Sequence, residues 1–182
     1  MPLNIEVALI EAAATENRSL ERLIGTVWPE AYRLALGILR DRGLAEDAAQ
    51  EACAAMAVSL SSLKSAGAFR AWFYRLVVNE SIAISRRQRD KAMPLDAAFE
   101  TVEFDGAEAL DLANALRQLP PEQRAVVLLH YYVGLSSSEI AVAVRFPSST
   151  VRFHLMLARR ALRRALSLAG HPASPEALSN AH

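Results

Sequence analysis

Several residue types that mark other classes of protein are scarce in this sequence. The single cysteine, Cys53, excludes an internal disulfide framework and suits a reducing cytoplasm. The seven glycines form no phosphate-binding loop. No apolar run approaches the roughly 20 residues needed to span a bilayer, and the start, MPLNIEVALIEAAATENR, lacks the basic beginning of a secretory signal. We therefore expect a cytoplasmic protein with no membrane insertion.

Alanine and leucine are abundant, and runs of alternating β-branched residues are almost absent, which predicts an all-α fold. With 52% hydrophobic and 22% charged residues, the composition is that of a globular protein. The four histidines share no spacing with Asp, Glu or Cys that would build a metal site, and His130 is best explained as part of a helix flank. We therefore predict no catalytic residues, no metal and no cofactor, and no enzymatic activity.

The charged residues are segregated along a chain whose net charge is zero. Between Lys91 and Arg117 every charged residue is an acid: Asp96, Glu100, Glu103, Asp105, Glu108 and Asp111. From position 145 to position 164 every charged residue is an arginine: Arg145, Arg152, Arg159, Arg160, Arg163 and Arg164. This segregation indicates an acidic segment and a separate surface for an anionic partner such as nucleic acid.

Helical periodicity in the first half predicts a series of helices. Apolar residues recur at three- and four-residue steps over residues 20–38, and Pro29 should kink or split that helix. We place Gly43 at the C′ position that ends it. The next helix should open at Leu44 with two acids in its first turn, and a third should begin near Ala68.

The chain divides into four parts. Residues 1–91 form a first helical domain, and residues 109–168 form a second, smaller one. Residues 92–108 contain Pro, Gly and acids but no helical stripe, so we interpret them as an acidic linker. Residues 169–182 are polar with two prolines, and we expect a disordered tail.

The second domain carries the start and stop signals of a helix-turn-helix. Pro121 stands where a helix tolerates a missing N–H. Ser136 and Glu139 have the spacing of a capping box, and Ser148 or Ser149 should cap the final helix. Two helices joined by a tight turn, resting on the preceding ones, make a helix-turn-helix.

In such a motif the second helix enters the major groove with its N-terminal residues at base edges. Arg152 is suited to donate two hydrogen bonds to guanine, and the hydroxyl groups before it are suited to bases or phosphates. Arginines farther along reach only the backbone and give salt-dependent affinity. The predicted DNA-binding residues are Ser148, Ser149, Thr150, Arg152, Phe153, His154 and Arg159.

Aromatic, amide and basic side chains interleave on one flank of the third predicted helix. These residues are Trp72, Arg75, Asn79, Arg86 and Arg87. Such a surface suits unstacked bases and phosphates. The alternative is a core aromatic cluster followed by a solvated basic end, and the residues alone leave that alternative open.

Three stretches together resemble the extracytoplasmic-function sigma factors, the small two-domain specificity subunits of bacterial RNA polymerase. AEDAAQEACAA resembles the family's Ala-Glu-Asp-x-x-Gln-Glu segment. FRAWFYRLVVNESIAISRRQR resembles its Phe-Arg-x-Trp-Leu-x-x-Ile-x-x-Asn stretch, which ends in Arg-Arg. ALRQLPPEQRAVVLLHYYVGLSSSEIA resembles its Ala-Leu-x-x-Leu-Pro run, which ends in Glu-Ile-Ala. The resemblance covers most of residues 18–166.

The resemblance implies a role for each surface. Asp47, Gln50 and Glu51 fall on the surface that docks on the clamp helices of the polymerase's largest subunit. The flank of the third helix matches the region that melts and reads the −10 promoter element, and the second domain would read the −35 element near the polymerase flap. It also implies an anti-sigma protein as a partner. In the free protein, we expect the acidic linker and the basic helix to hold the two domains together.

The reading helix departs from the family pattern. Ser149 replaces a glycine, His154 replaces an arginine, and Arg145 stands in place of the turn glycine, so the family's −35 preference is not carried over. Two alternatives remain open. SSTVRFHL also resembles the reading helix of LuxR-type regulators, and the altered helix would suit a sigma-like decoy that binds an anti-sigma protein without initiating transcription.

Overall fold

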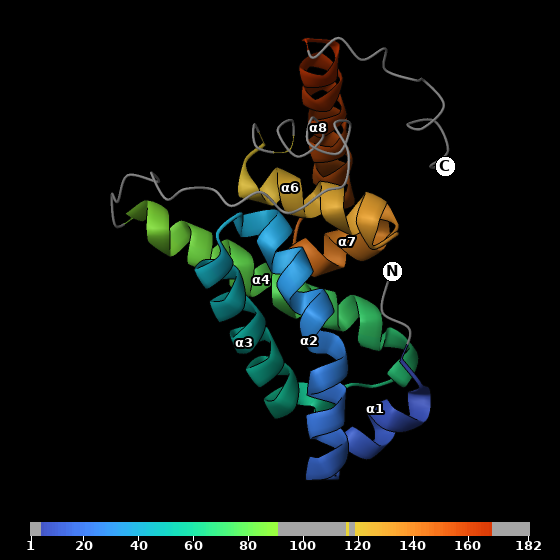
Figure 1. Ribbon diagram of the computed structural model, residues 1–182. Helices are drawn as coiled ribbons and strands as arrows, with labels where there is room; N and C mark the ends of the chain where they lie inside the picture. The colour runs from blue at the N-terminus through green and yellow to red at the C-terminus, as the bar shows by residue number, and fades with distance from the viewer. Residues whose placement is uncertain (1–4, 91–115, 117–118, 169–182) are drawn as a thin grey trace.

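The computed structural model describes residues 5–90, 116 and 119–168, and every regular element in these ranges is a helix (Figure 1). The predicted all-α fold is therefore confirmed. The predicted linker and tail lie outside the described residues. None of the described helices combines the length and the apolar character needed to cross a bilayer.

Residues 5–90, here called the first module, fold around the apolar face of one long helix. The elements are α1 (Val7–Ala13), α2 (Asn17–Leu39), α3 (Arg42–Ser59), 3₁₀ turns at Leu60–Ser62 and Ala66–Ala68, and α4 (Phe69–Asp90). The predicted stripe of α2 is buried, with Leu23, Val27 and Ile38 fully inaccessible. Pro29 lies on the exposed side of α2, which continues to Leu39, so Pro29 does not split the helix.

The junction between α2 and α3 differs from the prediction. Arg40, not Gly43, ends α2 in the left-handed conformation, with φ 64° and ψ 24°. Asp41 then caps α3, because its carboxylate accepts a hydrogen bond of 2.8 Å from the N–H of Leu44. Aspartate is a favoured N-cap residue. Helix α3 therefore starts two residues earlier than expected, and Gly43 lies in its first turn.

Residues 119–168, the second module, contain the predicted helix-turn-helix. The elements are α6 (Pro121–Val127), a π-helical turn (Leu128–Tyr132), α7 (Ser137–Val144) and α8 (Ser148–Leu168). Pro121 occupies the first position of α6, as predicted. The capping box is confirmed: Ser136 N–H donates to the Glu139 carboxylate at 2.8 Å, and Glu139 N–H donates to the Ser136 hydroxyl at 3.3 Å.

The turn between α7 and α8 is tight. Arg145 ends α7 in the left-handed conformation, with φ 56° and ψ 38°. This conformation costs a residue with a Cβ about 1 kcal/mol. Helix α8 begins at Ser148, and the Pro147 carbonyl accepts the N–H of Val151 at 3.1 Å. The prediction that a serine precedes and caps this helix is therefore wrong by one residue.

The two modules pack against each other. Helix α7 lies along α4, and α6 lies against α2 (Figure 1). Buried apolar residues from both modules form one continuous cluster that extends from Ile10 to Leu155. Helix α2 passes close to the π-helical turn at Gly37, where an added Cβ would lie 2.8 Å from Cδ1 at the end of the Leu128 side chain. The contribution predicted for the acidic linker remains a prediction, since that segment is not described.

Helix α8 extends beyond the body formed by the other helices (Figure 1). A second small cluster, made by Leu119, Val127 and Ala158, joins it to α6. The buried stripe of the first turns of α8 faces α7 through Val151 and Leu155. The opposite side of α8 is therefore left open.

Candidate nucleic-acid and polymerase interfaces

Four of the five residues predicted for the −10 element share one side of α4. At 3.6 residues per turn, Trp72, Arg75, Asn79 and Arg86 lie within about 60° of one another around the helix axis. The first three are partly exposed and Arg86 is exposed. Arg87 is also exposed but lies on a neighbouring flank.

Buried aromatic rings fix the start of this face. Phe69 and Phe73 are buried and stack with ring centroids 5.7 Å apart. Trp72 contacts Phe69 at a centroid distance of 5.8 Å, with the rings tilted by 51°. Phe69 and Phe73 therefore belong to the core, as the alternative interpretation requires, and Trp72 stands at its edge; the role in the −10 element stays a prediction.

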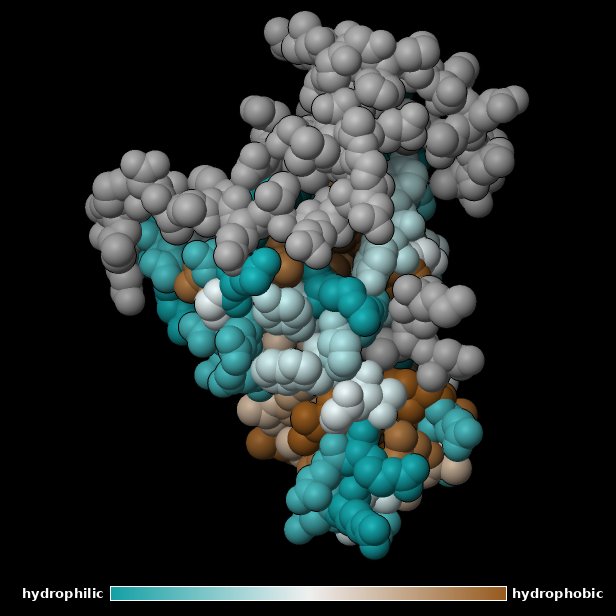
Figure 2. Space-filling view, viewed as in Figure 1, coloured by the Kyte–Doolittle hydropathy of each residue, from teal (hydrophilic) through white to brown (hydrophobic). Residues whose placement is uncertain are grey.

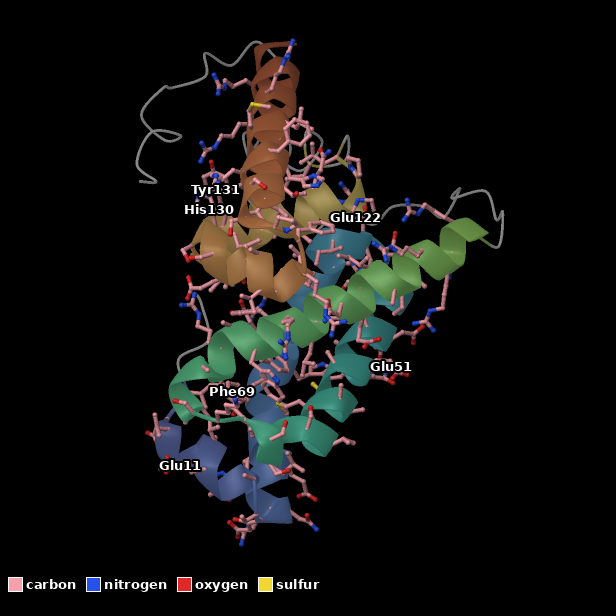
Figure 3. The ribbon with its side chains drawn as sticks, turned by 180° about the vertical axis from the view of Figure 1, so that it is seen from behind. Glu11, Glu51, Phe69, Glu122, His130 and Tyr131 are labelled. Atoms are coloured by element: carbon pink, nitrogen blue, oxygen red, sulfur yellow. The ribbon has the colours of Figure 1, made fainter. Side chains whose placement is uncertain are left out.

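The basic end of α4 is paired with the second module. Glu122 of α6 lies 3.7 Å from Arg86 Nε and 3.4 Å from Arg89 Nη2 (Figure 3). Sequence analysis did not select Arg89, although it continues the basic run of this helix. Because both arginines are more than half exposed, these pairs contribute little to stability in water.

The outward side of α8 carries most of the predicted −35 residues. Ser149, Arg152 and Phe153 are exposed, and Ser148 and Thr150 are partly exposed. Met156, Arg160 and Arg163 continue the exposed side toward the C-terminal end. The sequence contains no acidic residue between Glu139 and Glu176, so the charged side chains on this side are all basic. An α-helix with such a side is suited to a major groove.

His154 and Arg159 lie on the flanks of α8 and contact neighbouring elements. The His154 ring stacks on Phe146, with centroids 5.5 Å apart, and its Nδ1 is buried without a hydrogen-bond partner among the described residues. Arg159 Nε donates a 2.6 Å hydrogen bond to the Tyr131 hydroxyl, and the guanidinium lies 5.8 Å from the centre of that ring (Figure 3). Both residues therefore help to hold α8 in place.

The three residues predicted to contact polymerase are exposed together on α3. Asp47, Gln50 and Glu51 lie on the side opposite the buried Ala45, Ala49 and Met56. Figure 3 shows Glu51 pointing away from the body of the molecule. In the space-filling view, hydrophilic surface covers the C-terminal end of α4 and the adjoining start of α3 (Figure 2). An acidic face thus lies near the basic end of α4.

A buried carboxylate joins the two modules. Glu30 of α2 is 3% exposed and accepts hydrogen bonds from Tyr74 of α4 at 3.2 Å and from Tyr132 of the second module at 3.3 Å. Arg33 neutralises it at 2.6 Å. Burial raises the pKa of Tyr132, which keeps its hydroxyl protonated as a donor. Sequence analysis missed Glu30, although an acid inside an apolar stripe signals a buried polar partner.

A second hydrogen bond joins the two modules, and a pair of like charges between them acts against their contact. The Arg70 guanidinium of α4 donates a hydrogen bond to the Val133 carbonyl. Arg124 of α6 is also buried, and its pKa is lowered to about 10 by burial and by the charge of Arg40. Like charges between α2 and α6 disfavour the contact of these helices. The interface therefore combines attachments with an internal cost.

No cluster that would hold a metal ion occurs in the part of the chain that the structure describes. A cleft between α1 and α2, lined by residues such as Leu9, Ser19 and Arg22, contains none of the predicted site residues. The predicted sites are therefore exposed helix faces rather than enclosed pockets.

Comparison with protein families matches both modules. The model described as Sigma-70 region 2 matches residues 23–91, and the model described as Sigma-70, region 4 matches residues 109–162. Together they cover the helices that carry all three predicted surfaces. The match in the first module does not favour the LuxR-type alternative, and the comparisons do not favour the decoy.

Curated relatives are similar over most of their own length. The ECF RNA polymerase sigma-E factor of Escherichia coli is 32% identical over 134 residues, which span 64% of this chain and 70% of that protein. The RNA polymerase sigma factor SigV of Bacillus subtilis is 28% identical over 138 residues, spanning 72% and 81%. The ECF RNA polymerase sigma factor SigD of Mycobacterium tuberculosis is 28% identical over 163 residues, spanning 81% and 77%.

Two solved structures have a similar fold. One is CnrH in complex with the cytosolic domain of CnrY, with a TM-score of 0.65, 21% identity, and coverage of 89% of this chain and 97% of that one. The other is the sigma factor RpoE in complex with the anti-sigma factor NepR from Bartonella quintana. It has a TM-score of 0.68, 20% identity, and coverage of 81% and 96%.

Proposed function

The chain belongs to the extracytoplasmic-function family of RNA polymerase sigma factors and directs transcription initiation, and from that premise we propose which surface meets which partner. The first module binds core RNA polymerase through α3 and the −10 element through α4. The second module binds the −35 element through α8. The observation that supports this assignment is that the three faces lie on three different helices, exposed on α3 and α8 and partly exposed on α4, and that the face of α8 has no acidic residue.

Polymerase binding is assigned to the acidic face of α3. Asp47, Gln50 and Glu51 are exposed and rigidly spaced on one helix, so they are suited to charge-assisted hydrogen bonds with basic residues of the clamp helices. The second module contacts the polymerase flap in the same complex. Both contacts take place in the cytoplasm.

Recognition of the −10 element is assigned to the open side of α4. Opening DNA requires a base to leave the stack, and an unstacked base gains stacking on an aromatic ring. Trp72 is held at the edge of the core by Phe69 and offers such a ring. Asn79 offers donor and acceptor groups on the same side two turns farther along α4, and Arg86 and Arg87 hold the phosphates of the separated strand.

Recognition of the −35 element is assigned to the first turns of α8. Arg152 is exposed beside Ser149, near the helix N-terminus where base edges are read. His154 and Arg159 contribute to base recognition indirectly, because they hold α8 against Phe146 and Tyr131. The remaining arginines along the helix supply phosphate contacts, which act on all sequences alike.

The packed arrangement of the modules is a resting state that opens when polymerase and promoter bind. Glu122 competes with DNA for Arg86, and Glu30 holds Tyr132 of the other module. An anti-sigma protein is the further partner, and the similarity of the fold to RpoE, solved with the anti-sigma factor NepR, supports this assignment. Such a partner would hold the modules in one arrangement.

Transcription in vitro tests the proposal. Core polymerase with the full chain is supplied with fragmented DNA of the source organism, and the 5′ ends of the transcripts are sequenced. We expect a set of start sites that share two upstream elements. We also expect Trp72→Ala to reduce promoter opening more than it reduces the binding of the holoenzyme to closed duplex DNA. Binding of core polymerase without any promoter opening would establish the decoy instead.

A further inference from the structure

The side chains of α8 that point farthest from the body of the protein, and that would meet base edges, are apolar. Phe153 and Met156 are 53% and 54% exposed, and Ser149 and Arg160 lie before and after them on the same side of α8. At 100° per residue, Phe153 points almost directly away from the buried Val151 and Leu155. Arg152 lies on the flank. The centre of the reading face is therefore a phenyl ring, and the arginines surround it.

The Phe153 ring has an aromatic neighbour that is itself packed against the body of the protein. His154 stacks on Phe146 with an interplanar angle of 18°, and Phe153 meets the edge of His154 at a centroid distance of 6.3 Å. Phe146 itself packs against the main core. A phenylalanine side chain has only two rotatable torsions, so it loses little conformational freedom when it binds. The exposed Phe153 ring is thus suited to bind a partner at low entropic cost.

The positive charge around the Phe153 ring indicates which class of partner binds there. Arg152, Arg160 and Arg163 are exposed on this side, and no acidic residue lies between positions 139 and 176 of the sequence. A polyanion complements such a rim, whereas a protein partner would need a strongly acidic surface. Duplex DNA is therefore the occupant that the charges favour.

A phenyl ring distinguishes bases only by apolar contact. In the major groove the single apolar group on a standard base is the C5-methyl group of thymine, and phenylalanine is among the residues that contact it. Phe153 and Met156 are separated by about 4.5 Å along the helix axis, a spacing close to the roughly 3.4 Å between base pairs. Each side chain thus reaches its own base pair.

We propose that Phe153, with Met156 beside it, determines specificity by contacting thymine methyl groups of the upstream promoter element next to the guanine read by Arg152. This inference rests on the proposed function, since it requires α8 to enter the major groove of that element. Phe153 and Met156 cannot form side-chain hydrogen bonds with bases, so they would select the DNA sequence through apolar contacts. The element should therefore contain thymines whose methyl groups are required.

The experiment compares thymine with uracil, which lacks only the methyl group. Holoenzyme made from core polymerase and the full chain selects duplexes from a library randomised over the upstream element. The selected duplex is then resynthesised with uracil at each thymine in turn. We expect uracil at the contacted position to weaken wild-type binding about fourfold, the effect of one buried methyl group, and to leave the Phe153→Ser variant unaffected.

Two variants separate the methyl contact from other effects. Phe153→Leu keeps an apolar side chain and should retain the uracil sensitivity. Arg160→Ala should weaken all duplexes equally and retain it also. Equal binding of thymine and uracil duplexes by the wild-type holoenzyme would overturn the inference.

The outcomes also separate this inference from the proposed function. If the holoenzyme selects no upstream motif and opens no promoter, the proposed function fails. If it selects a motif that is insensitive to uracil, only the methyl contact fails. If Phe153→Ser leaves the motif unchanged but abolishes copurification with a protein partner, the face binds protein and the inference is wrong.

Discussion

The hydrogen bond between Tyr132 and Glu30 should control how often the two modules separate. Tyr132→Phe removes the hydroxyl that reaches from the second module to the buried carboxylate at 3.3 Å and leaves the ring in place. Tyr74→Phe is the matched control, because that hydroxyl donates to the same carboxylate at 3.2 Å from within the first module. The two changes delete the same group from opposite sides of the interface.

The size of the effect follows from the burial of the partners. A hydrogen bond to a charged acceptor contributes about 1.5–3 kcal/mol, but Tyr132 is 38% exposed and water can replace part of the interaction. We therefore expect a loss of about 1 kcal/mol in closure, which changes the ratio of open to closed molecules about fivefold. Tyr74 is fully buried, so its loss should lower the stability of the first module and leave the ratio unchanged.

Energy transfer between two dyes measures the ratio. Val58 of α3 is 85% exposed and Arg163 of α8 is also exposed, so cysteines at these positions accept labels without disturbing the core. The native Cys53 should stay unlabelled at pH 7, because burial raises the pKa of its thiol to about 11 and the thiolate is the reactive form. Single-molecule histograms then give the fractions of open and closed chains.

The comparison of the two variants decides the result. A larger open fraction in Tyr132→Phe than in Tyr74→Phe supports the role of Glu30 as the attachment between modules. Equal open fractions in the two variants would refute it, because the interface would then depend on its apolar packing and its other polar contacts. Thermal unfolding followed by circular dichroism confirms that both variants remain helical.

Three further predictions concern the second module. Arg145→Gly should raise the free energy of unfolding by about 0.5–1 kcal/mol because glycine adopts positive φ without strain, whereas Arg145→Ala removes the same charge without this gain; urea titration compares them. Hydrogen bonds from Ser136 lower the pKa of Glu139, so its stabilising effect is present above the unfolded pKa of about 4.3 and is lost as pH falls through the lower folded value. The stability difference between wild type and Glu139→Gln should accordingly shrink in acid, and a constant difference would count against the capping box. Arg160→Ala should reduce the slope of log affinity against log salt by about 0.9 for any duplex, as measured by fluorescence anisotropy, and an unchanged slope would exclude a phosphate contact.

Local signals in the sequence were sufficient to predict most helices. The stripe from Leu23 to Ile38, the proline at position 121 and the capping box at Ser136 each depend on residues within a few positions of one another. The errors at Gly43 and Ser148 have the same origin. In both places a second local signal, an aspartate cap or a proline carbonyl, moved the boundary by one or two residues.

The packing of the two modules was not predictable from such signals. Tyr132 and Glu30 are 102 positions apart, and no periodicity links them. The exposed faces of α3, α4 and α8 were predicted because each is periodic within one helix. The contacts of Arg86 with Glu122 and of Arg159 with Tyr131 were missed because each joins two helices.

The π-helical turn at Leu128–Tyr132 makes two distant contacts depend on one short segment. A π turn holds an extra residue, which rotates the side chains after it by about 100° relative to an α-helix. Adjacent side chains of a helix point about 100° apart, and in the register set by this turn Tyr131 reaches Arg159 of α8 and Tyr132 reaches Glu30. Deleting one residue from this segment would misalign both tyrosine contacts. The orientation of α8 and the packing of the two modules therefore depend on the same irregular turn.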